Sequence, residues 1–323
     1  MIDRLGRTID YMRISITDQC NLRCTYCMPG NKQLAQPGDI LSYEEILRLC
    51  RLSISLGIVN FKITGGEPLT RPGCVDFISS LKSLPGTEQV TITTNGLLLP
   101  THLDSLHAAG IDGINISLDT LHDDEYEKLT GYRAKGASLV KQAMIACIQR
   151  DIPVKVNTVL LNQSFADLTQ LAELAAQLPI AIRFIELMPI GAANTMEGIS
   201  AESALLMLKE SWPDLHPVEE HRGNGPARYY AATELIGRIG FIDAMSLPFC
   251  DRCNRIRLTA TGDLMPCLCQ DVGCNLRDPM RMGCTDEVLR ASIQHVIWNK
   301  PRKHHFLQAQ SIVERKTMNQ IGG

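Results

Sequence analysis

The chain has 323 residues, of which 45% are hydrophobic, and it carries a formal net charge of −3 at pH 7. This length allows one large core or two smaller ones, and the charge argues against nucleic acid or an anionic membrane as the main partner. With no signal peptide or apolar span of membrane length expected, we predict a cytoplasmic protein, in which twelve cysteines indicate metal or redox chemistry rather than disulfides.

Short β-rich runs alternate with helical stretches from the start of the chain. Strands are predicted at residues 13–17, 61–64, 90–94, 113–118, 154–160 and 180–187. Helices are predicted between them, at residues 43–56, 75–84, 103–109, 139–150 and 168–178. Ser42, followed by Glu45, predicts a capping box at the start of the first helix. The alternation indicates an α/β fold with a parallel sheet, arranged as a closed or partly closed barrel.

The pattern changes after about residue 223. Short strands are predicted at residues 227–232, 238–242 and 255–261, followed by a helix at residues 287–298. Six cysteines gather in this part of the chain: Cys250, Cys253, Cys267, Cys269, Cys274 and Cys284. We therefore predict two units, residues 1–222 and a smaller cysteine-rich module at residues 223–323. Three other cysteines, Cys50, Cys74 and Cys147, fall in helical patterns and are predicted to be small buried apolar residues.

The residues best suited to chemistry come directly after predicted strands. Cys20 to Cys27 follow the first strand, the run 65–68 follows the second, and Asn95 with Gly96 follows the third. Because the carboxyl-terminal ends of parallel strands meet at one edge of a barrel, these residues are predicted to share a site.

The first cysteine cluster, TDQCNLRCTYCMPG, spaces Cys20, Cys24 and Cys27 as C-x3-C-x2-C. Structural zinc sites and ferredoxin clusters use four protein ligands, so three thiolates leave one iron of a cluster open. The alternatives are a zinc site completed by a distant residue and three buried structural cysteines. The spacing, with Tyr26 before the third cysteine, resembles the radical S-adenosylmethionine (SAM) superfamily. That resemblance implies a [4Fe–4S] cluster whose open iron binds SAM, and the run ITGGEP (63–68) resembles the superfamily's SAM-binding motif.

The second cluster places Cys250 and Cys253 two residues apart, with Cys267 further on. Spacing alone leaves a four-cysteine zinc site that includes Cys269 as an equal alternative. The surrounding run FCDRCNRIRLTATGDLMPCL resembles the GTP 3′,8-cyclase family. The likeness spans nearly the whole chain through KITGGEPLTR, TTNGLLL, INISLDTL, VKVNTVL, RFIELMPIG, GPARYY and the final Gly-Gly, which in the family reaches back into the active site.

The resemblance implies a partial (β/α)6 TIM-like barrel of the radical SAM type. It implies a second [4Fe–4S] cluster on Cys250, Cys253 and Cys267, with an open iron facing guanine. The implied SAM contacts are Tyr26, Gly66, Ser117 and Met188. The implied GTP contacts are Arg13, Lys62, Thr93, Lys155, Arg183, Arg255, Ile256 and Arg257. Several cations in this set suit a triphosphate, and Arg255 and Arg257 alternate along a strand and so face the same way.

The implied activity is conversion of GTP to 3′,8-cyclo-7,8-dihydro-GTP, the first step of molybdenum cofactor biosynthesis. Electrons would come from a donor such as flavodoxin, and cyclic pyranopterin monophosphate synthase would take the product. The alternatives are a peptide-modifying radical SAM enzyme with an auxiliary cluster and a non-catalytic iron–sulfur or zinc protein. The oligomeric state, a homodimer included, stays open.

Two departures from the family pattern stand out. Lys62 occupies a position where many members carry Arg, which keeps the charge and loses the bidentate geometry. The segment CLCQDVGC adds Cys269 and Cys274 beside the expected ligand Cys267. Ligand exchange at the second cluster is therefore an open question.

Overall fold

A computed structural model describes residues 1–28, 30, 34–220, 222–269, 273–304, 306 and 317–322. Its framework is one twelve-stranded sheet in the order β12-β11-β10-β1-β2-β3-β4-β5-β6-β9-β8-β7. The first six strands are β1 (Tyr11–Ser15), β2 (Asn60–Thr64), β3 (Gln89–Thr94), β4 (Ile114–Ser117), β5 (Val154–Leu160) and β6 (Ala181–Glu186). They pair in parallel and in chain order, which confirms the predicted α/β barrel framework.

Strands from the second half of the chain extend both edges of this sheet. They are β7 (His216–Val218), β8 (Arg228–Ala231), β9 (Arg238–Ile242), β10 (Arg255–Leu258), β11 (Asp263–Met265) and β12 (Cys274–Asn275). β10 joins β1 and β9 joins β6, both in parallel, and the remaining strands add antiparallel. The described sheet therefore runs across the predicted boundary at residue 223, and the division into residues 1–222 and 223–323 stays a prediction.

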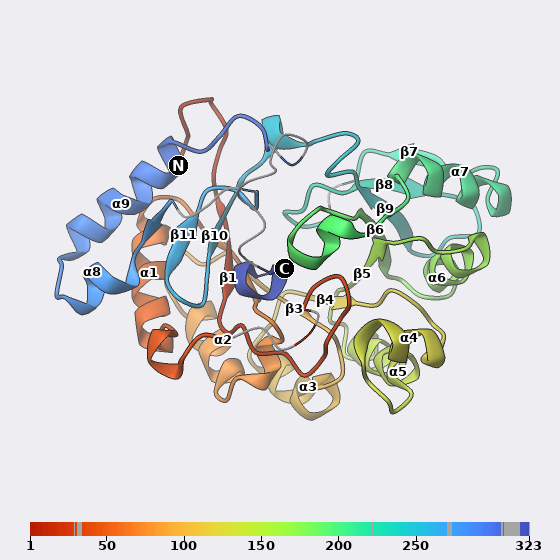
Figure 1. The fold of residues 1–323 in the computed structure, drawn as a ribbon, viewed down its shortest axis with the longest axis horizontal. Helices are drawn as coiled ribbons and strands as arrows, with labels where there is room; N and C mark the ends of the chain where they lie inside the picture. Colours follow the sequence, from red (N-terminus) through yellow and green to blue (C-terminus); the bar gives the residue numbers. More distant parts are fainter. Residues whose placement is uncertain are drawn as a thin grey trace.

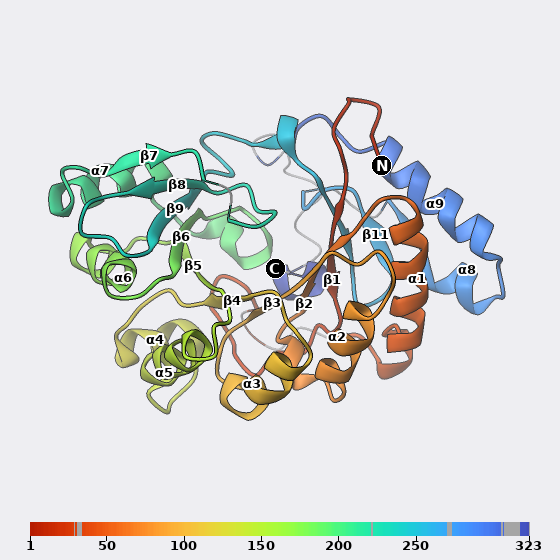
Figure 2. The ribbon, with the colours of Figure 1, turned by 180° about the vertical axis from the view of Figure 1, so that it is seen from behind.

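Helices α1 to α9 lie around the outside of the curved sheet, whereas α10 lies on its inner side, next to β1 (Figures 1 and 2). In chain order they are α1 (Tyr43–Ser55), α2 (Cys74–Lys82), α3 (Leu99–Ala108), α4 (Asp123–Thr130), α5 (Gly136–Ile148), α6 (Phe165–Gln177), α7 (Ala201–Ser211), α8 (Arg277–Arg281), α9 (Asp286–Trp298) and α10 (Met318–Ile321). Short 3-10 turns are η1 (Pro37–Asp39), η2 (Pro68–Thr70), η3 (Gly191–Thr195) and η4 (Cys250–Arg252). Among the described helices, none is long and apolar enough to cross a membrane.

Helix ends follow local chemistry. The capping box predicted for α1 is present, because the Ser42 side chain accepts from Glu45 N–H at 3.1 Å and Glu45 Oε2 accepts from Ser42 N–H at 2.7 Å. α3 begins four residues earlier than predicted, with Pro100 in its first turn, where the missing N–H has no helical partner to lose. Cys50, Cys74 and Cys147 are buried in α1, α2 and α5, as predicted.

α4 and α7 were not predicted from the sequence. In α4 only Tyr126 and Thr130 are buried, so its sequence carries no apolar stripe at helical spacing. In α7 the buried positions Ala201, Ala204 and Leu208 have helical spacing, but two of the three are small alanines. α4 packs on α5, and α7 packs on α6 and β6, so both helices are stabilised by tertiary contacts.

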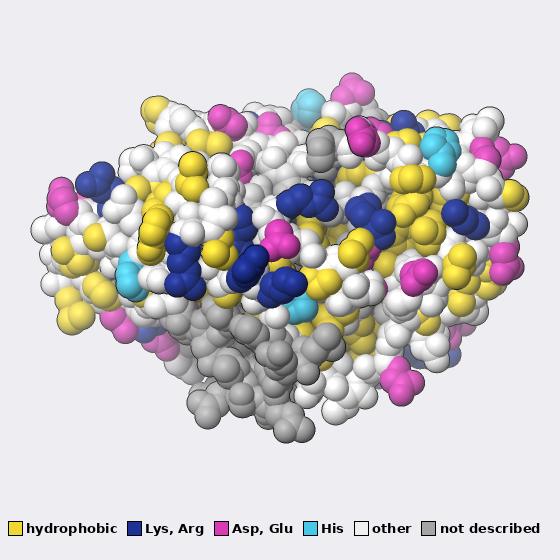
Figure 3. Space-filling view, turned by 90° about the horizontal axis from the view of Figure 1, so that it is seen from above, with side chains coloured by type: hydrophobic (Ala, Val, Ile, Leu, Met, Phe, Trp, Pro, Cys, Tyr) yellow, Lys and Arg dark blue, Asp and Glu magenta, His cyan; other side chains and the backbone are white. Residues whose placement is uncertain are grey.

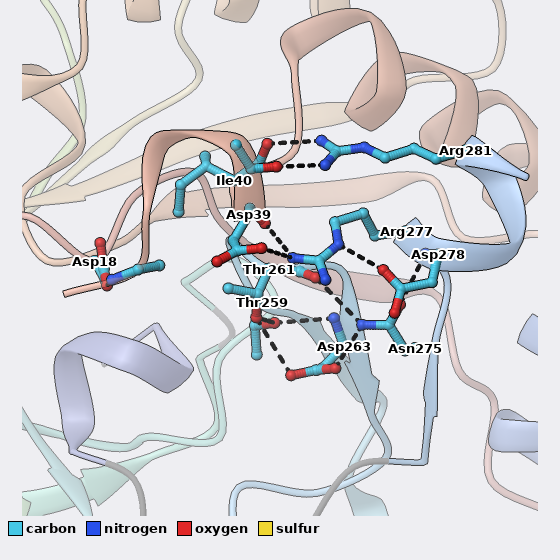
Figure 4. Close-up of polar contacts among 12 residues, drawn as sticks. Asp18, Asp39, Ile40, Thr259, Thr261, Asp263, Asn275, Arg277, Asp278 and Arg281 are labelled. Atoms are coloured by element: carbon cyan, nitrogen blue, oxygen red, sulfur yellow. Dashed lines mark hydrogen bonds and ion pairs between the residues drawn. The ribbon is translucent and has the colours of Figure 1, made fainter. Parts of the chain in front are cut away.

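α8, which follows β12 at the end of the sheet, is hydrogen-bonded to η1 and to the first turn of α1 (Figure 4). Arg281 Nε and Nη2 donate to the Glu45 carboxylate at 2.7 and 2.9 Å. Arg277 Nη1 donates to the Asp39 carbonyl oxygen at 2.7 Å. The cysteine-rich part is therefore tied to the first helix by charge-assisted bonds that cross more than two hundred residues of sequence.

Candidate functional site

The loop that follows β1, residues 16–28, carries the first three cysteines at the carboxyl-terminal edge of the sheet. Cys27 N–H and Met28 N–H donate to the Cys24 carbonyl oxygen at 3.1 and 2.9 Å, forming a turn between the second and third cysteines. Arg23 N–H donates to Thr130 O at 2.8 Å, which holds the loop against the end of α4. This loop is called the cysteine loop below.

The three thiols of the cysteine loop share one partly buried space. Burial raises the pKa of Cys20, Cys24 and Cys27, that of Cys27 to about 12, and neighbouring thiolate charge raises the pKa of Cys24 and Cys27 further. Three thiolates this close are ionised together only beside a cation. The donor set therefore fits the iron of a cluster, which binds cysteine as thiolate.

The two glycines of the ITGGEP run let β2 approach the cysteine loop. A Cβ on Gly66 would lie 2.3 Å from Gln19 O, and a Cβ on Gly65 would lie 2.5 Å from Thr17 O. Gly66 N–H donates to Thr17 O at 2.7 Å across this contact. The first reason for glycine here is thus backbone packing against the cysteine loop, rather than room for a ligand.

Glu67 ends the same run and is buried beneath the cysteine loop. Its carboxylate accepts from Leu69 N–H at 3.0 Å, Thr94 Oγ1 at 2.9 Å and Asn95 N–H at 2.7 Å. Burial raises the pKa of Glu67 to about 7. Glu67 thus joins the ends of β2 and β3, and Asn95 Nδ2 continues the network to Asn21 Oδ1 at 2.7 Å.

The predicted SAM contacts lie at this same edge of the sheet. Ser117 ends β4, Met188 follows β6, and Gly66 follows β2. Tyr26 in the cysteine loop donates through its hydroxyl to Asp119 Oδ2 at 2.6 Å. Asp119 also accepts from Val159 N–H at 2.8 Å, so it fixes Tyr26 between two strands. The sequence analysis missed Asp119, although it stands two residues after Ser117 in the run INISLDTL.

The register of β10, β1 and β2 brings three predicted GTP ligands into one row. Arg13 is paired with Lys62 on one side and with Arg257 on the other. Because Met12 and Ile14 pack in the core beneath the helices, the intervening Arg13 faces the concave interior. The row therefore lines the inside of the curved sheet.

Arg183 continues this lining from β6. Its Nη2 donates to Asn115 Oδ1 at 3.0 Å and to Asn157 Oδ1 at 2.6 Å. Lys155 lies on β5 beside Asn115, with which it is in register. The two asparagines were not predicted as site residues, although Asn115 stands two residues before Ser117 and Asn157 two residues after Lys155, so each shares a strand face with a predicted ligand.

Burial and mutual repulsion lower the pKa values of the interior lysines. Burial lowers the pKa of Lys62 well below its usual range, and the charges of Arg183, Arg13 and Lys155 lower it further. Burial and then Arg183 lower the pKa of Lys155 to about 8. In the described part of the chain, Lys62, Lys155, Arg183, Arg255 and Arg257 form no ion pair with a carboxylate. Uncompensated cations of this kind favour a polyanionic ligand.

Two other predicted GTP ligands have limited side-chain roles. Thr93 Oγ1 lies 3.4 Å from Asn115 Nδ2, within the same polar lining. The Ile256 side chain is fully buried in the core, so only its backbone faces the interior side of β10. The Arg255 guanidinium stacks on the Phe249 ring, 4.8 Å from the ring centre.

A cavity of about 980 Å³ reaches this lining from the β7–β8 side. Its walls include Tyr229, Phe249, Asn254 and Arg255, together with residues 223–226. The volume lies in the range of ligand pockets. Figure 3 shows Lys and Arg side chains gathered on the middle of the face seen from above. An anion approaching this face meets positive charge before it reaches the interior.

The second cysteine triad lies at the opposite end of the sheet. Cys250 and Cys253 precede β10, which runs parallel to β1, whereas the cysteine loop follows β1. Cys267 follows β11, which runs antiparallel to β10 and so returns to the same end. Burial raises the pKa of Cys253, but Arg255 and Lys300 outweigh it and leave that pKa below its usual value.

Cys267 has a further thiol beside it. The Cys267 and Cys269 thiols are within hydrogen-bonding distance, and this contact, with the charge of Lys300, lowers the pKa of Cys267 to about 5. Lys300 is itself held by the Arg255 carbonyl oxygen at 2.8 Å. The second triad therefore sits in a cationic environment that favours thiolates, the form that binds metal.

Neither triad is arranged around one metal ion. Within the described ranges, no group of three or more Cys, His, Asp or Glu side chains converges on a position for a single ion. A tetrahedral zinc site, with zinc–sulfur bonds of about 2.3 Å, draws its sulfurs to within about 4 Å of one another. Metal content, rather than the arrangement of these thiols, separates a zinc site from an iron–sulfur cluster.

The chain's last described segment, residues 317–322, returns to the barrel. Arg257 Nη1 donates to the Gly322 carbonyl oxygen at 2.7 Å, and Asn319 Nδ2 donates to Asp18 O at 2.9 Å. Asn319 N–H also bonds the Cys27 sulfur. The tail thus links the basic row to the cysteine loop, with its end close to β1 (Figure 1). Gly323 of the predicted Gly-Gly end lies outside the described residues.

Comparison with known proteins agrees with this geometry. A family model described as "Radical SAM superfamily" matches residues 14–175, and one described as "Molybdenum Cofactor Synthesis C" matches residues 180–306. Curated proteins named GTP 3′,8-cyclase from Clostridium perfringens and Heliobacterium modesticaldum are each 41% identical, over the whole of both chains. The chain belongs to the GTP 3′,8-cyclase family of the radical SAM superfamily.

Solved structures of the superfamily share the fold. Streptococcus suis SuiB bound to its precursor peptide superposes with a TM-score of 0.63 at 15% identity, covering 92% of this chain and 66% of that one. SuiB bound to S-adenosylmethionine gives a TM-score of 0.60 at 16% identity, covering 81% of this chain and 61% of that chain. At this identity the likeness concerns the fold alone, and it confirms the predicted radical SAM type of α/β barrel.

Family membership confirms two of the predicted cofactors. A radical SAM enzyme uses S-adenosylmethionine and an iron–sulfur cluster, and the cysteine loop has the donors for that cluster. The second cluster and the individual SAM and GTP contacts stay predictions.

Proposed function

We propose that this GTP 3′,8-cyclase family member converts GTP to 3′,8-cyclo-7,8-dihydro-GTP, the first step of molybdenum cofactor biosynthesis. One observation carries the proposal: Lys62, Lys155, Arg183 and Arg257, which form no ion pair with a carboxylate among the described residues, lie between two thiol triads at opposite ends of one sheet. Arg13 is the middle residue of β1, whose five residues span about 13 Å. A nucleotide bound at the basic row is thus within reach of both ends.

The basic row and Arg183 hold the triphosphate in this proposal. Arg13, Arg257 and Arg183 offer planar donor forks to phosphate oxygens, while Lys62 and Lys155 contribute point charges. Asn115 and Asn157 keep Arg183 oriented through the bonds at 3.0 and 2.6 Å. Binding a polyanion offsets the electrostatic repulsion among these cations. Part of the affinity for GTP therefore comes from removing a repulsion that is present in the free protein.

Tyr26, Gly66, Ser117 and Met188 surround the SAM position in this proposal. Asp119 keeps Tyr26 in place, and Glu67 keeps the ends of β2 and β3 together. A cluster on Cys20, Cys24 and Cys27, when bound, supplies the electron that splits SAM into methionine and a 5′-deoxyadenosyl radical. The chain's contribution is to hold ribose C3′ of GTP next to that position and to exclude water.

Cys250, Cys253 and Cys267 hold a second [4Fe–4S] cluster in this proposal. With three protein thiolates, one iron of that cluster would lack a protein ligand and could bind guanine, and Arg255 would stand in the wall of the cavity that admits the nucleotide. The product passes to cyclic pyranopterin monophosphate synthase, and a flavodoxin or similar donor supplies electrons.

The test is an anaerobic incubation of the reduced, reconstituted chain with SAM and GTP. We expect 5′-deoxyadenosine and the cyclised nucleotide to accumulate together, and neither to accumulate when ATP replaces GTP. If 5′-deoxyadenosine forms at the same rate with and without GTP and no cyclised product appears, the proposal is contradicted. That result favours the peptide-modifying alternative.

A matched pair of variants tests the basic row. Arg183→Ala removes a buried cation that contacts two asparagines, whereas Arg51→Ala removes an exposed one on α1. Loss of a charge-assisted bond of about 1.5–3 kcal/mol predicts GTP affinity roughly ten to a hundredfold weaker in Arg183→Ala and unchanged in Arg51→Ala. Equal affinities in the two variants place GTP elsewhere.

Metal analysis separates the cluster assignment from the zinc alternative. Two four-iron clusters predict about eight irons per chain after anaerobic reconstitution. One zinc per chain and few irons support a zinc-stabilised module instead.

A further inference from the structure

The turn after β11 places two thiols in direct contact. Cys267 Sγ and Cys269 Sγ lie 3.5 Å apart. Cys269 is buried, with 4% of its surface exposed, so it is shielded from bulk reagents that reach Cys267. Cys269 is an addition to the family pattern, for which the sequence left ligand exchange with Cys267 and a four-cysteine zinc site open.

This contact argues against Cys269 as a fourth ligand of the second cluster. Each iron of a [4Fe–4S] cluster takes one terminal thiolate. Two sulfurs in contact compete for one iron, so Cys269 in this position is an alternative to Cys267 and leaves the open iron free. The 3.5 Å separation of the two sulfurs means that they need to approach by only about 1.5 Å to reach the disulfide bond length of about 2.05 Å.

We propose that Cys267 and Cys269 form a reversible disulfide whenever the second site is free of metal. A Cys267 thiolate attacks oxidised glutathione, or a similar small disulfide, and releases one glutathione thiolate. Cys269, as thiolate, then attacks the Cys267 sulfur of the mixed disulfide and releases the second. The two protein thiols lose two electrons and two protons, and one oxidised glutathione becomes two glutathiones.

The disulfide would protect a metal ligand and control cluster insertion. Cys267 in a disulfide is not oxidised further to sulfinic acid, and a thiol reductant restores it. The same bond removes one of the three proposed ligands of the second cluster, so that site stays empty until reduction. This consequence rests on the proposed second cluster, whereas the disulfide itself does not.

The neighbouring sequence makes the disulfide directly measurable. Cleavage before Asp263 and Asp271 releases the peptide DLMPCLCQ, residues 263–270, in which Cys267 and Cys269 are the only cysteines. The full-length chain is stripped of iron by a chelator under anaerobic conditions, treated with oxidised glutathione, alkylated and digested. We expect the peptide to resist alkylation and to be about 2 Da lighter than the dithiol form, having lost two hydrogens.

Cysteine variants identify which two thiols form the disulfide. Cys274→Ala is expected to keep the light peptide. Cys269→Ala and Cys269→Ser are expected to lose it and to carry glutathione on Cys267 instead, because the resolving thiol is gone. Internal closure should exceed mixed-disulfide formation about tenfold or more in the wild type, since the two thiols are already adjacent.

A wild-type peptide that is alkylated at both cysteines, or Cys267 linked to Cys250 or Cys253, overturns the proposal.

Iron uptake tests whether the disulfide blocks insertion of the second cluster. Oxidised wild type is expected to take up about four irons fewer per chain than the reduced protein, and thiol reduction to restore them. A light peptide with unchanged iron uptake would keep the disulfide and contradict the second cluster, so the two failures are distinguishable.

Discussion

Lys155 is an interior cation whose charge changes near neutral pH. Burial and the charge of Arg183 lower its pKa to about 8 in the free protein. It is protonated below that pH and neutral above it, and a triphosphate favours the protonated form. We therefore expect the dissociation constant for GTP to rise up to about tenfold as pH increases from 7.5 to 9, measured anaerobically by equilibrium dialysis.

Lys155→Arg is the control for this pH dependence. A guanidinium keeps its charge throughout this range, so the rise in dissociation constant near pH 8 should disappear. An unchanged pH profile in Lys155→Arg would assign the dependence to another group.

Gly66 shows how one missing side chain supports a metal site. A Cβ at this position would lie 2.3 Å from Gln19 O and 2.8 Å from Asp18 O, both in the cysteine loop. Gly66→Ala should push the loop off β2, and we expect about four irons per chain to be lost on reconstitution. Gly38→Ala is the matched control, because nothing lies within 4 Å of its Cβ position. Full iron content in Gly66→Ala would show that the loop adjusts.

At the scale of elements, the capping box of α1 was predicted correctly, whereas those of α6 and α10 were not predicted. The reciprocal bonds of Ser42 and Glu45 need only three residues of separation and a helix start, so the sequence contains everything that forms them. The strand at residues 154–160 was likewise predicted with its observed ends, because apolar residues alternate throughout it.

Removing the α1 cap has a calculable cost. Ser42→Ala loses the bond to Glu45 N–H and should lower the free energy of unfolding by about 1 kcal/mol. Ser80→Ala, at an exposed position in α2, should leave it within about 0.5 kcal/mol of the wild type. Urea denaturation of the metal-free chain measures both. Equal midpoints would mean that Glu45, also bonded to Arg281, maintains the helix start without Ser42.

At the scale of the whole molecule, Arg7 joins the beginning of the chain to its cysteine-rich part. Its guanidinium binds Asp3 Oδ2 at 2.6 Å and donates to the carbonyl oxygens of Cys250 at 2.9 Å and Pro301 at 2.9 Å. The side chains of Arg7 and Asp3 are both buried. The N-terminal segment is thus part of the wall around the second triad.

Arg7→Ala should destabilise the fold far more than an average surface change. It leaves the buried Asp3 carboxylate without its cation, a loss of about 3–5 kcal/mol in the free energy of unfolding. Arg4→Ala removes an exposed cation from the same segment and serves as the control. Denaturant unfolding compares the two variants. A small effect for Arg7→Ala would mean that water replaces its bonds.

The sequence by itself determined the local chemistry of this protein. The spacing of Cys20, Cys24 and Cys27, the alternation in the strands and the capping box each depend on residues close together in the chain. The resemblance to the GTP 3′,8-cyclase family depends on such motifs as well.

The tertiary structure decided how these parts meet. No local pattern reveals that β10 pairs with β1, which sets Arg257 beside Arg13, or that Asp119 receives the Tyr26 hydroxyl. The contact between Cys267 and Cys269 also depends on how the turn after β11 is folded. Strand register and side-chain packing are set by burial across the whole sheet, and that free energy belongs to residues far apart in sequence.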